Sequence, residues 1–453
     1  VEINFGTYTN NWNGYKESNT LNSILEDTSN GNFSPNIGSP LIDAGTIISG
    51  ITDQYTNNGT APDIGAYEKN NSNWTAGHDW NVDATFGSKW IPMHNLTING
   101  NSGFRMMSSP VSGAILSDLL DELWLQGMTG GDVSSYNPNV WILDLAGQSW
   151  SAINNISTQS LSAGQGFLIY VFDDCDNDGS SDLPIDLFVS GDHNQNDVTI
   201  SSIPQNNYYL AGNPYNKTID WDNISKTNLS GVISVWDDAS SDWKTYNGTS
   251  GDLTNGLIAP FQGFWVQANG GTGSITISPS HKATTAGTLY RVSDAQETGS
   301  VTFNVNSTDF SDQTFISFQS TGEVGLDNAD GYKLFPLSHS DRIVAISYAD
   351  DTGLDINNLP YDNQEDILIP FDIMKLQLDG ESYITQEEEV TFTWDVSNLP
   401  DHISLTLIDQ ITNIETNMNL ISSITFTTQP KGSFSTSYSG PVGTYPALGE
   451  ARF

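Results

Sequence analysis

The chain has 453 residues and carries 54 Asp and Glu against 14 Lys and Arg, which gives a formal net charge of −40. A protein this acidic repels phosphate backbones, so nucleic acids are excluded as partners. Its 37% hydrophobic and 11% aromatic residues are sufficient for packed cores. Its length suggests about three domains. The single cysteine, Cys175, excludes an intrachain disulfide.

The two ends of the chain and its apolar content indicate a compartment. No apolar run approaches the roughly 20 residues of a transmembrane helix, which predicts no membrane span. The chain begins Val1-Glu2-Ile3 without an initiator Met or a signal-peptide core, and we expect an internal piece of a longer protein. Strong acidity suits a salty exterior, where ions screen charge repulsion. We therefore expect an extracellular or cell-surface location.

Two short strings mark the first part of the chain, Ser39-Pro40-Leu41-Ile42-Asp43-Ala44-Gly45 and Pro62-Asp63-Ile64-Gly65-Ala66-Tyr67-Glu68. They resemble the closing coils of secreted right-handed parallel β-helix proteins, a group that includes polysaccharide lyases and surface proteins of Bacteroidota. The resemblance implies the end of a parallel β-helix over residues 1–68. Because one or two coils cannot bury an interior, most of that helix is expected upstream of Val1.

Residues 69–103 are interpreted as a connecting segment, in which Trp74, Trp80 and Trp90 pack against the neighbouring domains. The next part, residues 104–285, is predicted to be a duplicated β domain with copies at about 104–191 and 208–282. Three blocks recur in the same order, namely Phe104–Pro110 with Tyr208–Pro214, Val140–Asp144 with Ile233–Asp237, and Gly164–Ile169 with Phe261–Val266. We expect two similar units that share one interface.

One helix is predicted as an insertion in the first copy. Apolar residues recur there at three- and four-residue spacing, and Gly127 is a plausible C-terminal stop; they are Ile115, Leu116, Leu119, Leu120, Leu123 and Trp124. Nearly everything else alternates between apolar and polar residues, with Asn-Gly and Asp-Gly turns. The fold class is therefore all-β.

Residues 286–453 are predicted to form an antiparallel β-sandwich, because strands recur at regular spacing with polar turns. Together with the duplicated region they resemble the C-terminal part of large exported Bacteroidota proteins, through Gly212-Asn213-Pro214-Tyr215, Pro260-Phe261-Gln262-Gly263-Phe264 and Gly325–Leu334. The resemblance implies cargo of type IX secretion. In such proteins Phe453 would fall within the last strand and a sorting domain would come after it, so we expect truncation or removal of the C-terminal signal.

The sharpest local motif is Asp174-Cys175-Asp176-Asn177-Asp178-Gly179-Ser180-Ser181-Asp182. Oxygen donors at positions 1, 3, 5, 7 and 9, with glycine at 6, match the ligand spacing of calcium loops. We predict that the side chains of Asp174, Asp176, Asp178 and Asp182 and the carbonyl of Ser180 bind a structural Ca²⁺. Position 12 is Ile185, whereas an EF-hand has Glu. The alternative is an acidic turn held by Asx hydrogen bonds.

Other polar and aromatic groups are weaker candidates. A looser acidic stretch is interpreted as a solvated loop; it contains Asp350, Asp351, Asp355, Asp362, Glu365 and Asp366. Asp192, His193, Asn194, Asn196 and Asp197 are interpreted as a polar hairpin tip. Trp236, Trp243 and Trp265 suit a carbohydrate platform, but two of them recur at duplicated strand positions, which favours core packing.

No compact catalytic motif is present, since the six histidines are dispersed and there is no nucleophile elbow. The first interpretation is a non-catalytic part of a secreted adhesin or stalk protein. Its partners would be extracellular glycans or proteins, and self-association through edge strands stays open. The alternative is an accessory region of a secreted polysaccharide lyase or hydrolase whose catalytic β-helix lies upstream. Paired acids for glycoside hydrolysis are not excluded.

Overall fold

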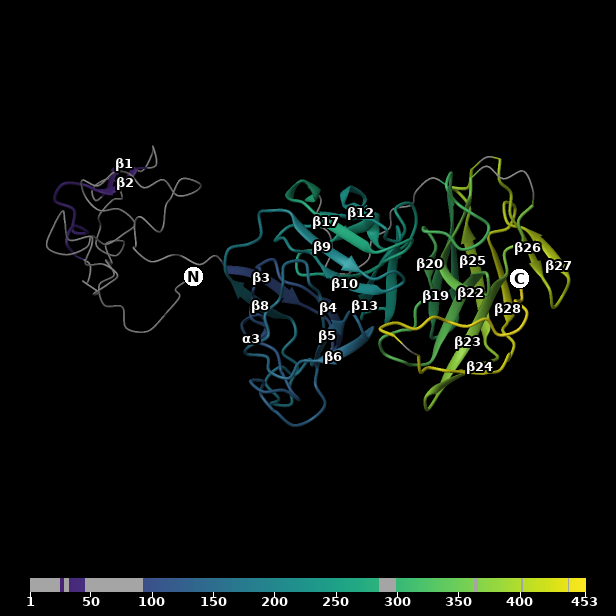
Figure 1. Ribbon diagram of the computed structural model, residues 1–453, viewed down its shortest axis with the longest axis horizontal. Helices are drawn as coiled ribbons and strands as arrows, with labels where there is room; N and C mark the ends of the chain where they lie inside the picture. The colour runs from purple at the N-terminus through teal and green to yellow at the C-terminus, as the bar shows by residue number, and fades with distance from the viewer. Residues whose placement is uncertain are drawn as a thin grey trace. The chain divides into compact units, whose positions relative to one another are not determined.

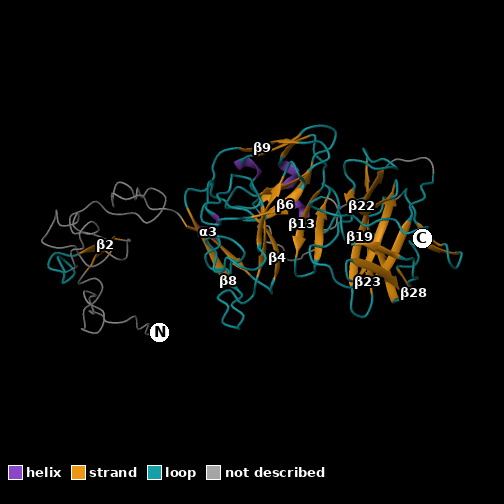
Figure 2. Cartoon of the chain, turned by 60° about the horizontal axis from the view of Figure 1, so that its bottom comes forward, coloured by secondary structure: helices purple, strands orange, loops and turns teal. Residues whose placement is uncertain are grey.

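The computed structural model describes residues 25–27, 32–44, 93–284, 299–361, 366–400, 402–438 and 440–453. The chain separates into two compact units, residues 1–91 and 92–453. Strands dominate the described residues (Figure 2). Helical structure there is limited to α3 (Leu116–Leu119) and three 3-10 segments, η4 (Trp221–Asn223), η5 (Thr254–Gly256) and η6 (Pro279–His281). The predicted all-β class is confirmed.

In the first unit the structure describes one small antiparallel pair, β1 (Leu25–Asp27) and β2 (Asn32–Pro35). Stacked coils of a parallel β-helix pair their strands in parallel, so the β-helix predicted for residues 1–68 is not confirmed. The first of the two strings that suggested it forms turns up to Ala44. The second string, and Trp74, Trp80 and Trp90, lie outside the described residues.

Two four-stranded antiparallel sheets in the second unit have the same strand order, β4-β7-β5-β6 and β10-β16-β13-β14. Their strands are β4 (Gly103–Met107), β5 (Val140–Asp144), β6 (Ser149–Ala152), β7 (Phe167–Val171), β10 (Tyr208–Gly212), β13 (Ile233–Asp237), β14 (Asp242–Tyr246) and β16 (Gly263–Gln267). The register repeats as well, because Met107 pairs with Phe167 where Ala211 pairs with Phe264. The residues matched in the sequence are therefore equivalent in the structure.

Each copy adds a second, smaller sheet. In the first copy β3 (Met93–Ile98) pairs with β8 (Ile185–Ser190). In the second copy β17 (Gly273–Ile277) pairs with both β9 (Val198–Ile203) and β12 (Ser225–Thr227), and a short pair, β11 (Ile219–Asp220) and β15 (Leu257–Ile258), lies nearby in the chain. Each copy thus begins one strand earlier than expected, and β3 belongs to the segment that was predicted to be a connection.

The two copies meet in a pseudo-two-fold interface, in which equivalent residues exchange equivalent hydrogen bonds. The backbone N–H of Ser108 donates to the carbonyl of Phe261 at 2.7 Å, and that of the equivalent Gly212 donates to Gly164 at 2.9 Å. Asn194, in the connection between the copies, donates through Nδ2 to the carbonyls of both equivalent prolines, Pro110 and Pro214. The two copies therefore share an interface made of equivalent residues.

Close backbone approach at this interface requires glycine. A Cβ on Gly166 would lie 2.7 Å from the carbonyl oxygen of Ala211 and 2.7 Å from Cγ of Leu210. We expect Gly166→Ala to lower the free energy of unfolding by roughly 1–3 kcal/mol, since backbone from the other copy must move. Denaturant unfolding measures this. Gly231→Ala is the control, because its nearest contact is an ordinary 3.4 Å; equal losses in both variants would contradict the expectation.

The long helix predicted around Ile115–Trp124 is wrong, because only α3 is helical there. Leu116, Leu119, Leu120 and Leu123 are nevertheless buried in the core of the first copy. The spacing of the apolar residues therefore predicted correctly which side chains are buried, but not the helix. Consecutive turns bury these side chains as well as a helix would.

The remaining strands form one ten-stranded sheet, which we call the C-terminal sheet, in the order β28-β25-β18-β19-β22-β21-β23-β24-β29 with β20 beside β22. Its strands are β18 (Ser300–Asn306), β19 (Ser311–Gln319), β20 (Gly331–Tyr332), β21 (Arg342–Ala349), β22 (Thr352–Pro360), β23 (Phe371–Asp379), β24 (Ser382–Gln386), β25 (Glu389–Asp395), β28 (Ser423–Thr427) and β29 (Ser433–Ser435). β26 (Thr406–Asp409) and β27 (Ile414–Asn417) form a separate hairpin. Figure 1 shows this part of the chain in green to yellow.

The C-terminal sheet curls around one core. Phe303 of β18 lies 5.2 Å from Phe371 of β23, between ring centroids, although three strands separate β18 from β23 in the sheet. Phe392 of β25 stacks on both rings. Only a curved sheet brings these strands together, so the predicted sandwich takes the form of one folded sheet and not of two separate ones. All its described pairs are antiparallel except β19 with β22, which is parallel.

Candidate metal centre

The predicted calcium loop connects β7 to β8 in the first copy, and it spans residues 172–184. The matching connection of the second copy, residues 268–272, is much shorter. The loop is anchored by Cys175, whose side chain is buried in the core of the first copy and whose Sγ lies 3.4 Å from the carbonyl oxygen of Phe172. The loop is therefore a feature of one copy, attached to a shared fold.

Three of the predicted ligands converge in this loop. One carboxylate oxygen from each of Asp174, Asp176 and Asp182 lies within 4.8 Å of the other two. Two oxygens bound to one Ca²⁺ at 2.3–2.6 Å are at most about 5 Å apart, so this spacing fits a single ion. Asp174 is partly buried and Asp176 is exposed, which leaves the group open to solvent.

The backbone folds around these carboxylates. Asp174 accepts hydrogen bonds from the N–H groups of Asp178 at 3.0 Å and Gly179 at 2.9 Å, and Asp182 accepts one from Cys175 at 2.7 Å. Positive φ angles at Asn177 (59°) and Gly179 (92°) turn the chain back on itself. Glycine at position 179 adopts that angle without strain. These hydrogen bonds and turns hold the loop in a compact conformation.

One of the four predicted aspartate ligands, Asp178, stands apart from the group. The carboxylate of Asp178 accepts the N–H of Ser180 at 2.8 Å and is not among the three that converge. This hydrogen bond, and that from Asp178 N–H to Asp176 at 3.1 Å, belong to the Asx turns of the alternative interpretation. The geometry contains both features, three converging carboxylates and a self-bonded acidic turn.

Negative charge affects the neighbouring thiol. Burial, with the charges of Asp182 and Asp174, raises the pKa of Cys175 to about 11. The thiol is therefore protonated at neutral pH and a poor metal ligand or nucleophile. The predicted ligands are then all oxygen atoms, and such a set suits hard cations, Ca²⁺ or Mg²⁺, better than zinc.

The other acidic stretches divide into two kinds. Asp350 and Asp351 form the exposed turn between β21 and β22, and Asp366 is exposed. Asp355 is different, because it is buried on β22, so its interpretation as part of a solvated loop is wrong. Asp362 and Glu365 lie outside the described residues. The group around His193 is the connection between the copies rather than a hairpin tip, and the His193 ring contacts that of His94.

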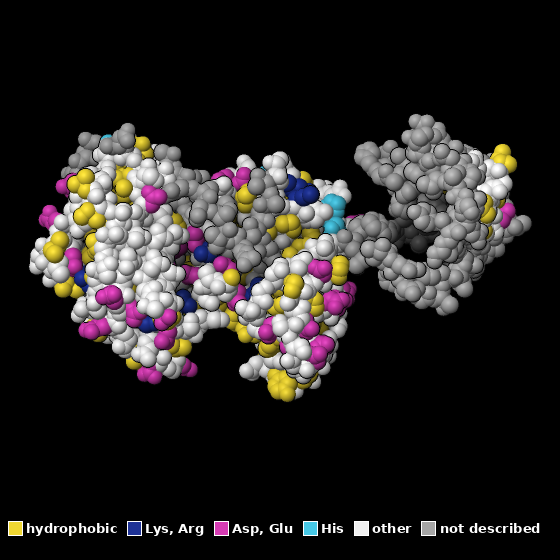
Figure 3. All heavy atoms as spheres, turned by 180° about the vertical axis from the view of Figure 1, so that it is seen from behind, with side chains coloured by type: hydrophobic (Ala, Val, Ile, Leu, Met, Phe, Trp, Pro, Cys, Tyr) yellow, Lys and Arg dark blue, Asp and Glu magenta, His cyan; other side chains and the backbone are white. Residues whose placement is uncertain are grey.

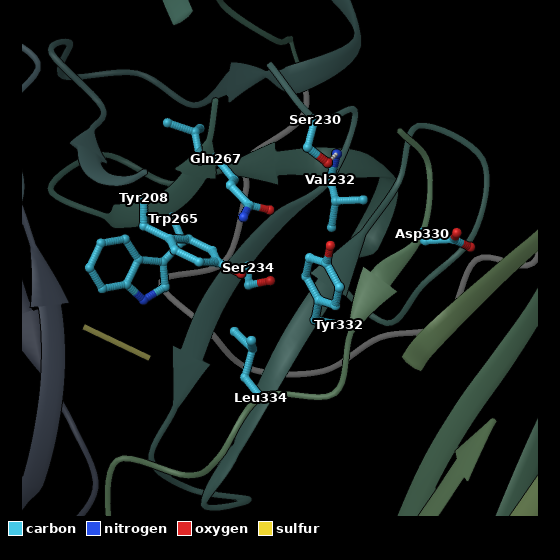
Figure 4. Close-up of a pocket in the computed structure, with 10 residues that line it drawn as sticks. Tyr208, Ser230, Val232, Ser234, Trp265, Gln267, Asp330, Tyr332 and Leu334 are labelled. Atoms are coloured by element: carbon cyan, nitrogen blue, oxygen red, sulfur yellow. Dashed lines mark hydrogen bonds between the residues drawn. The ribbon is translucent and has the colours of Figure 1, made fainter. Parts of the chain in front are cut away.

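The tryptophans proposed for a sugar platform are buried. Trp236, Trp243 and Trp265 are 2–4% exposed, which confirms the core interpretation. Trp265 lines a small pocket with Tyr208 and Ser234 of the second copy and with Tyr332 and Leu334 of the C-terminal region (Figure 4). Its volume of about 20 Å³ has room for about one water molecule, which is far too little for a sugar ring.

A larger hollow of about 690 Å³, with both polar and apolar lining residues, lies between the copies and was not predicted from the sequence. Arg105 lines it and pairs with Asp238 at 3.2 Å. Arg105 also donates to the carbonyls of Asn99 at 3.2 Å and Asn101 at 3.0 Å. Because these bonds hold the guanidinium within the protein, the residue joins the two copies.

Comparisons with models of known protein families, with curated proteins and with solved structures found no match. Within the part of the chain that the structure describes, no helix has the length and apolar character needed to cross a membrane. Asp and Glu side chains are scattered over the visible face, with few Lys and Arg among them (Figure 3).

Proposed function

We propose that this chain is a calcium-stabilised, non-catalytic region of a secreted cell-surface protein, an adhesin or a stalk. The observation that carries the proposal is the convergence of the Asp174, Asp176 and Asp182 carboxylates in a loop that only the first copy has. An ion bound there orders a surface loop and neutralises charge in a strongly acidic chain. Its role is structural, because the carboxylates lie on an exposed turn and not in a substrate-sized cleft.

The packing of the aromatic residues and the placement of the histidines support a non-catalytic role. The described histidines lie in separate parts of the fold, apart from the contact between His94 and His193. His339 contacts Tyr383, and His402 contacts Tyr361. The extracellular location and type IX secretion are part of the same proposal and rest on the acidic composition and on the family resemblance. The β-helix end over residues 1–68 stays a prediction.

Calorimetric titration of the Ca²⁺-free protein tests the metal site. We expect binding heat from the wild type, no heat from the Asp174→Asn, Asp176→Asn variant, and unchanged heat from Asp144→Asn, an exposed carboxylate at the β5–β6 turn of the same copy. Asp178→Asn distinguishes the converging group from the full sequence motif. The variant should keep the binding heat if the three converging carboxylates hold the ion, because the Asp178 carboxylate lies outside that group. At a calcium concentration of 100 Kd the ion should stabilise the fold by about 2.7 kcal/mol.

The single cysteine supplies a local control. Cys175 lies between two of the proposed ligands, so its alkylation rate reports on this loop alone. We expect slow alkylation with Ca²⁺ and faster alkylation after a chelator is added, since opening the loop exposes the thiol. Equal heats from the wild type and the double variant, with alkylation unaffected by chelator, would reject the metal site. Release of sugar products from polysaccharides by this chain would reject the non-catalytic role.

A further inference from the structure

Lys333 is buried inside the C-terminal sheet with two carboxylates. It directly follows β20, and its neighbours Tyr332 and Leu334 are directed at the pocket against the second copy (Figure 4). Because side chains alternate along an extended chain, Lys333 points the other way, toward β19 and β22. Lys333 is 5% exposed, Asp312 of β19 is 9% exposed and Asp355 of β22 is 5% exposed.

The Lys333 amine directs all its hydrogens at protein oxygens. Nζ lies 2.9 Å from Oδ1 of Asp312, 2.8 Å from Oδ1 of Asp355 and 2.8 Å from the carbonyl oxygen of Gln313. The second oxygen of Asp312, Oδ2, accepts the backbone N–H of Ala345 in β21 at 2.7 Å. An amine, a carboxyl carbon, a second carboxylate and a polarising N–H are thus held together in a site that excludes bulk water.

Exclusion of water changes the protonation of this group. Burial raises the pKa of Asp312 to about 7 and that of Asp355 to about 6, although Lys333 opposes both shifts. A neutral carboxylic acid, which an amine is able to attack, is therefore populated near neutral pH. Burial also lowers the pKa of Lys333, but the two carboxylates outweigh it and raise that pKa. The amine becomes neutral by passing a proton along its short hydrogen bonds to a carboxylate.

We propose that Lys333 and Asp312 condense to a side-chain amide bond, with Asp355 as the proton carrier. Nζ attacks Cγ of Asp312, and the N–H of Ala345 stabilises the negative charge that develops on Oδ2. Asp355 accepts a proton from Nζ and delivers a proton to Oδ1. The Nζ–Cγ bond forms, the Cγ–Oδ1 bond breaks, and one water molecule leaves. No atom is oxidised or reduced.

Asp312 is the electrophile because its two oxygens have different partners. Oδ1 faces the amine and leaves as water, while Oδ2 is held by a backbone donor. Asp355 is held in contact with the amine, which is the position a proton carrier needs. The fixed geometry replaces an encounter in solution, which lowers the barrier to condensation. The bond joins β19 to the segment that packs on the second copy, and so it would resist pulling and proteolysis.

The test is the intact mass of the folded full chain, followed by peptide mapping. We expect the wild type to be lighter than its sequence by one water molecule, and a branched peptide to join Lys333 to Asp312. Lys333→Met and Asp355→Asn should have their full sequence masses. Lys244→Met is the matched control, because it removes another lysine–carboxylate pair, the partly buried Lys244 with Asp252 at 2.9 Å, and should keep the water loss.

A wild type of full sequence mass overturns the proposal without any variant, and so does a water loss that maps to other residues. Retention of the branched peptide in folded Asp355→Asn overturns the role of Asp355. The result is independent of calcium, since the Asp174, Asp176 and Asp182 group lies in the first copy and the lysine site in the C-terminal sheet. The two proposals therefore fail separately.

Discussion

Trp243→Ala is expected to lower the free energy of unfolding by about 3–5 kcal/mol, the range for removal of a large buried aromatic side chain. Trp243 is 4% exposed, and its ring lies 5.4 Å from that of Trp236, its partner across β13 and β14. Its indole N–H donates at 2.7 Å to the carbonyl of Phe335. The substitution leaves a cavity where the second copy meets the C-terminal region and removes the donor to a buried carbonyl.

The duplication supplies a matched control for this experiment. Trp150 is the equivalent residue of the first copy, pairs with Leu143 as Trp243 pairs with Trp236, and is only partly buried. We expect a smaller loss for Trp150→Ala in the same denaturant titration. The loss of stability for Trp243→Phe should fall between those for Trp150→Ala and Trp243→Ala, because phenylalanine keeps most of the apolar contact and loses the hydrogen bond. Equal losses for Trp150→Ala and Trp243→Ala would show that the contact with Phe335 adds nothing.

The strands of the two copies were predictable because similar sequence blocks occur twice, and equivalent positions in the two blocks have equivalent strand partners. The blocks containing Asp144 and Asp237 keep both their sequence pattern and their pairing, with Asp144 opposite Ser149 and Asp237 opposite Asp242. The strands β3 and β9 were missed because they share no such block. Only a weak alternation marks them, with Ile98 buried in one and Val198, Ile200 and Ile203 buried in the other.

The lysine site was not predictable from spacing along the chain. Along the chain Lys333 lies 21 residues from Asp312 and 22 residues from Asp355. The three meet because β19 and β22 pair in parallel while β20 pairs with β22. Asp355 was grouped with exposed neighbours because sequence shows charge but not which side of a strand faces inward. The calcium loop was predictable in part, since its ligands are local, but the hydrogen bond that turns Asp178 toward Ser180 was not.

The buried carboxyl of Asp330, in the C-terminal region, should make the free energy of unfolding depend on pH. Asp330 is 4% exposed, and its two oxygens accept the N–H groups of Asn358 and Asp327, each at 2.7 Å. Burial raises the pKa of Asp330 to about 7; the two N–H groups oppose the shift, and the charges of Asp327 and Asp350 add to it. Burial therefore outweighs the hydrogen bonds, and the folded protein holds a proton that the unfolded chain releases.

The sign of the effect follows from the two pKa values. The unfolded chain releases this proton near pH 3.9 and the folded protein near pH 7, so the folded state binds more protons between these values. The stabilisation is complete below about pH 4 and is lost as the pH rises toward about 7, with a slope of at most about 1.4 kcal/mol per pH unit. Asp330→Asn has no such proton, so the stability of the wild type relative to this variant should fall as the pH rises.

Urea unfolding of the wild type and of Asp330→Asn across this pH range measures the difference directly, and the other carboxylates cancel because both proteins contain them. If the wild type instead gains stability over Asp330→Asn as the pH rises, the hydrogen bonds from Asn358 and Asp327 stabilise the ionised carboxylate more than burial destabilises it. Asp330 would then be an ionised carboxylate that accepts hydrogen bonds from both residues and so links the segment before β20 to β22.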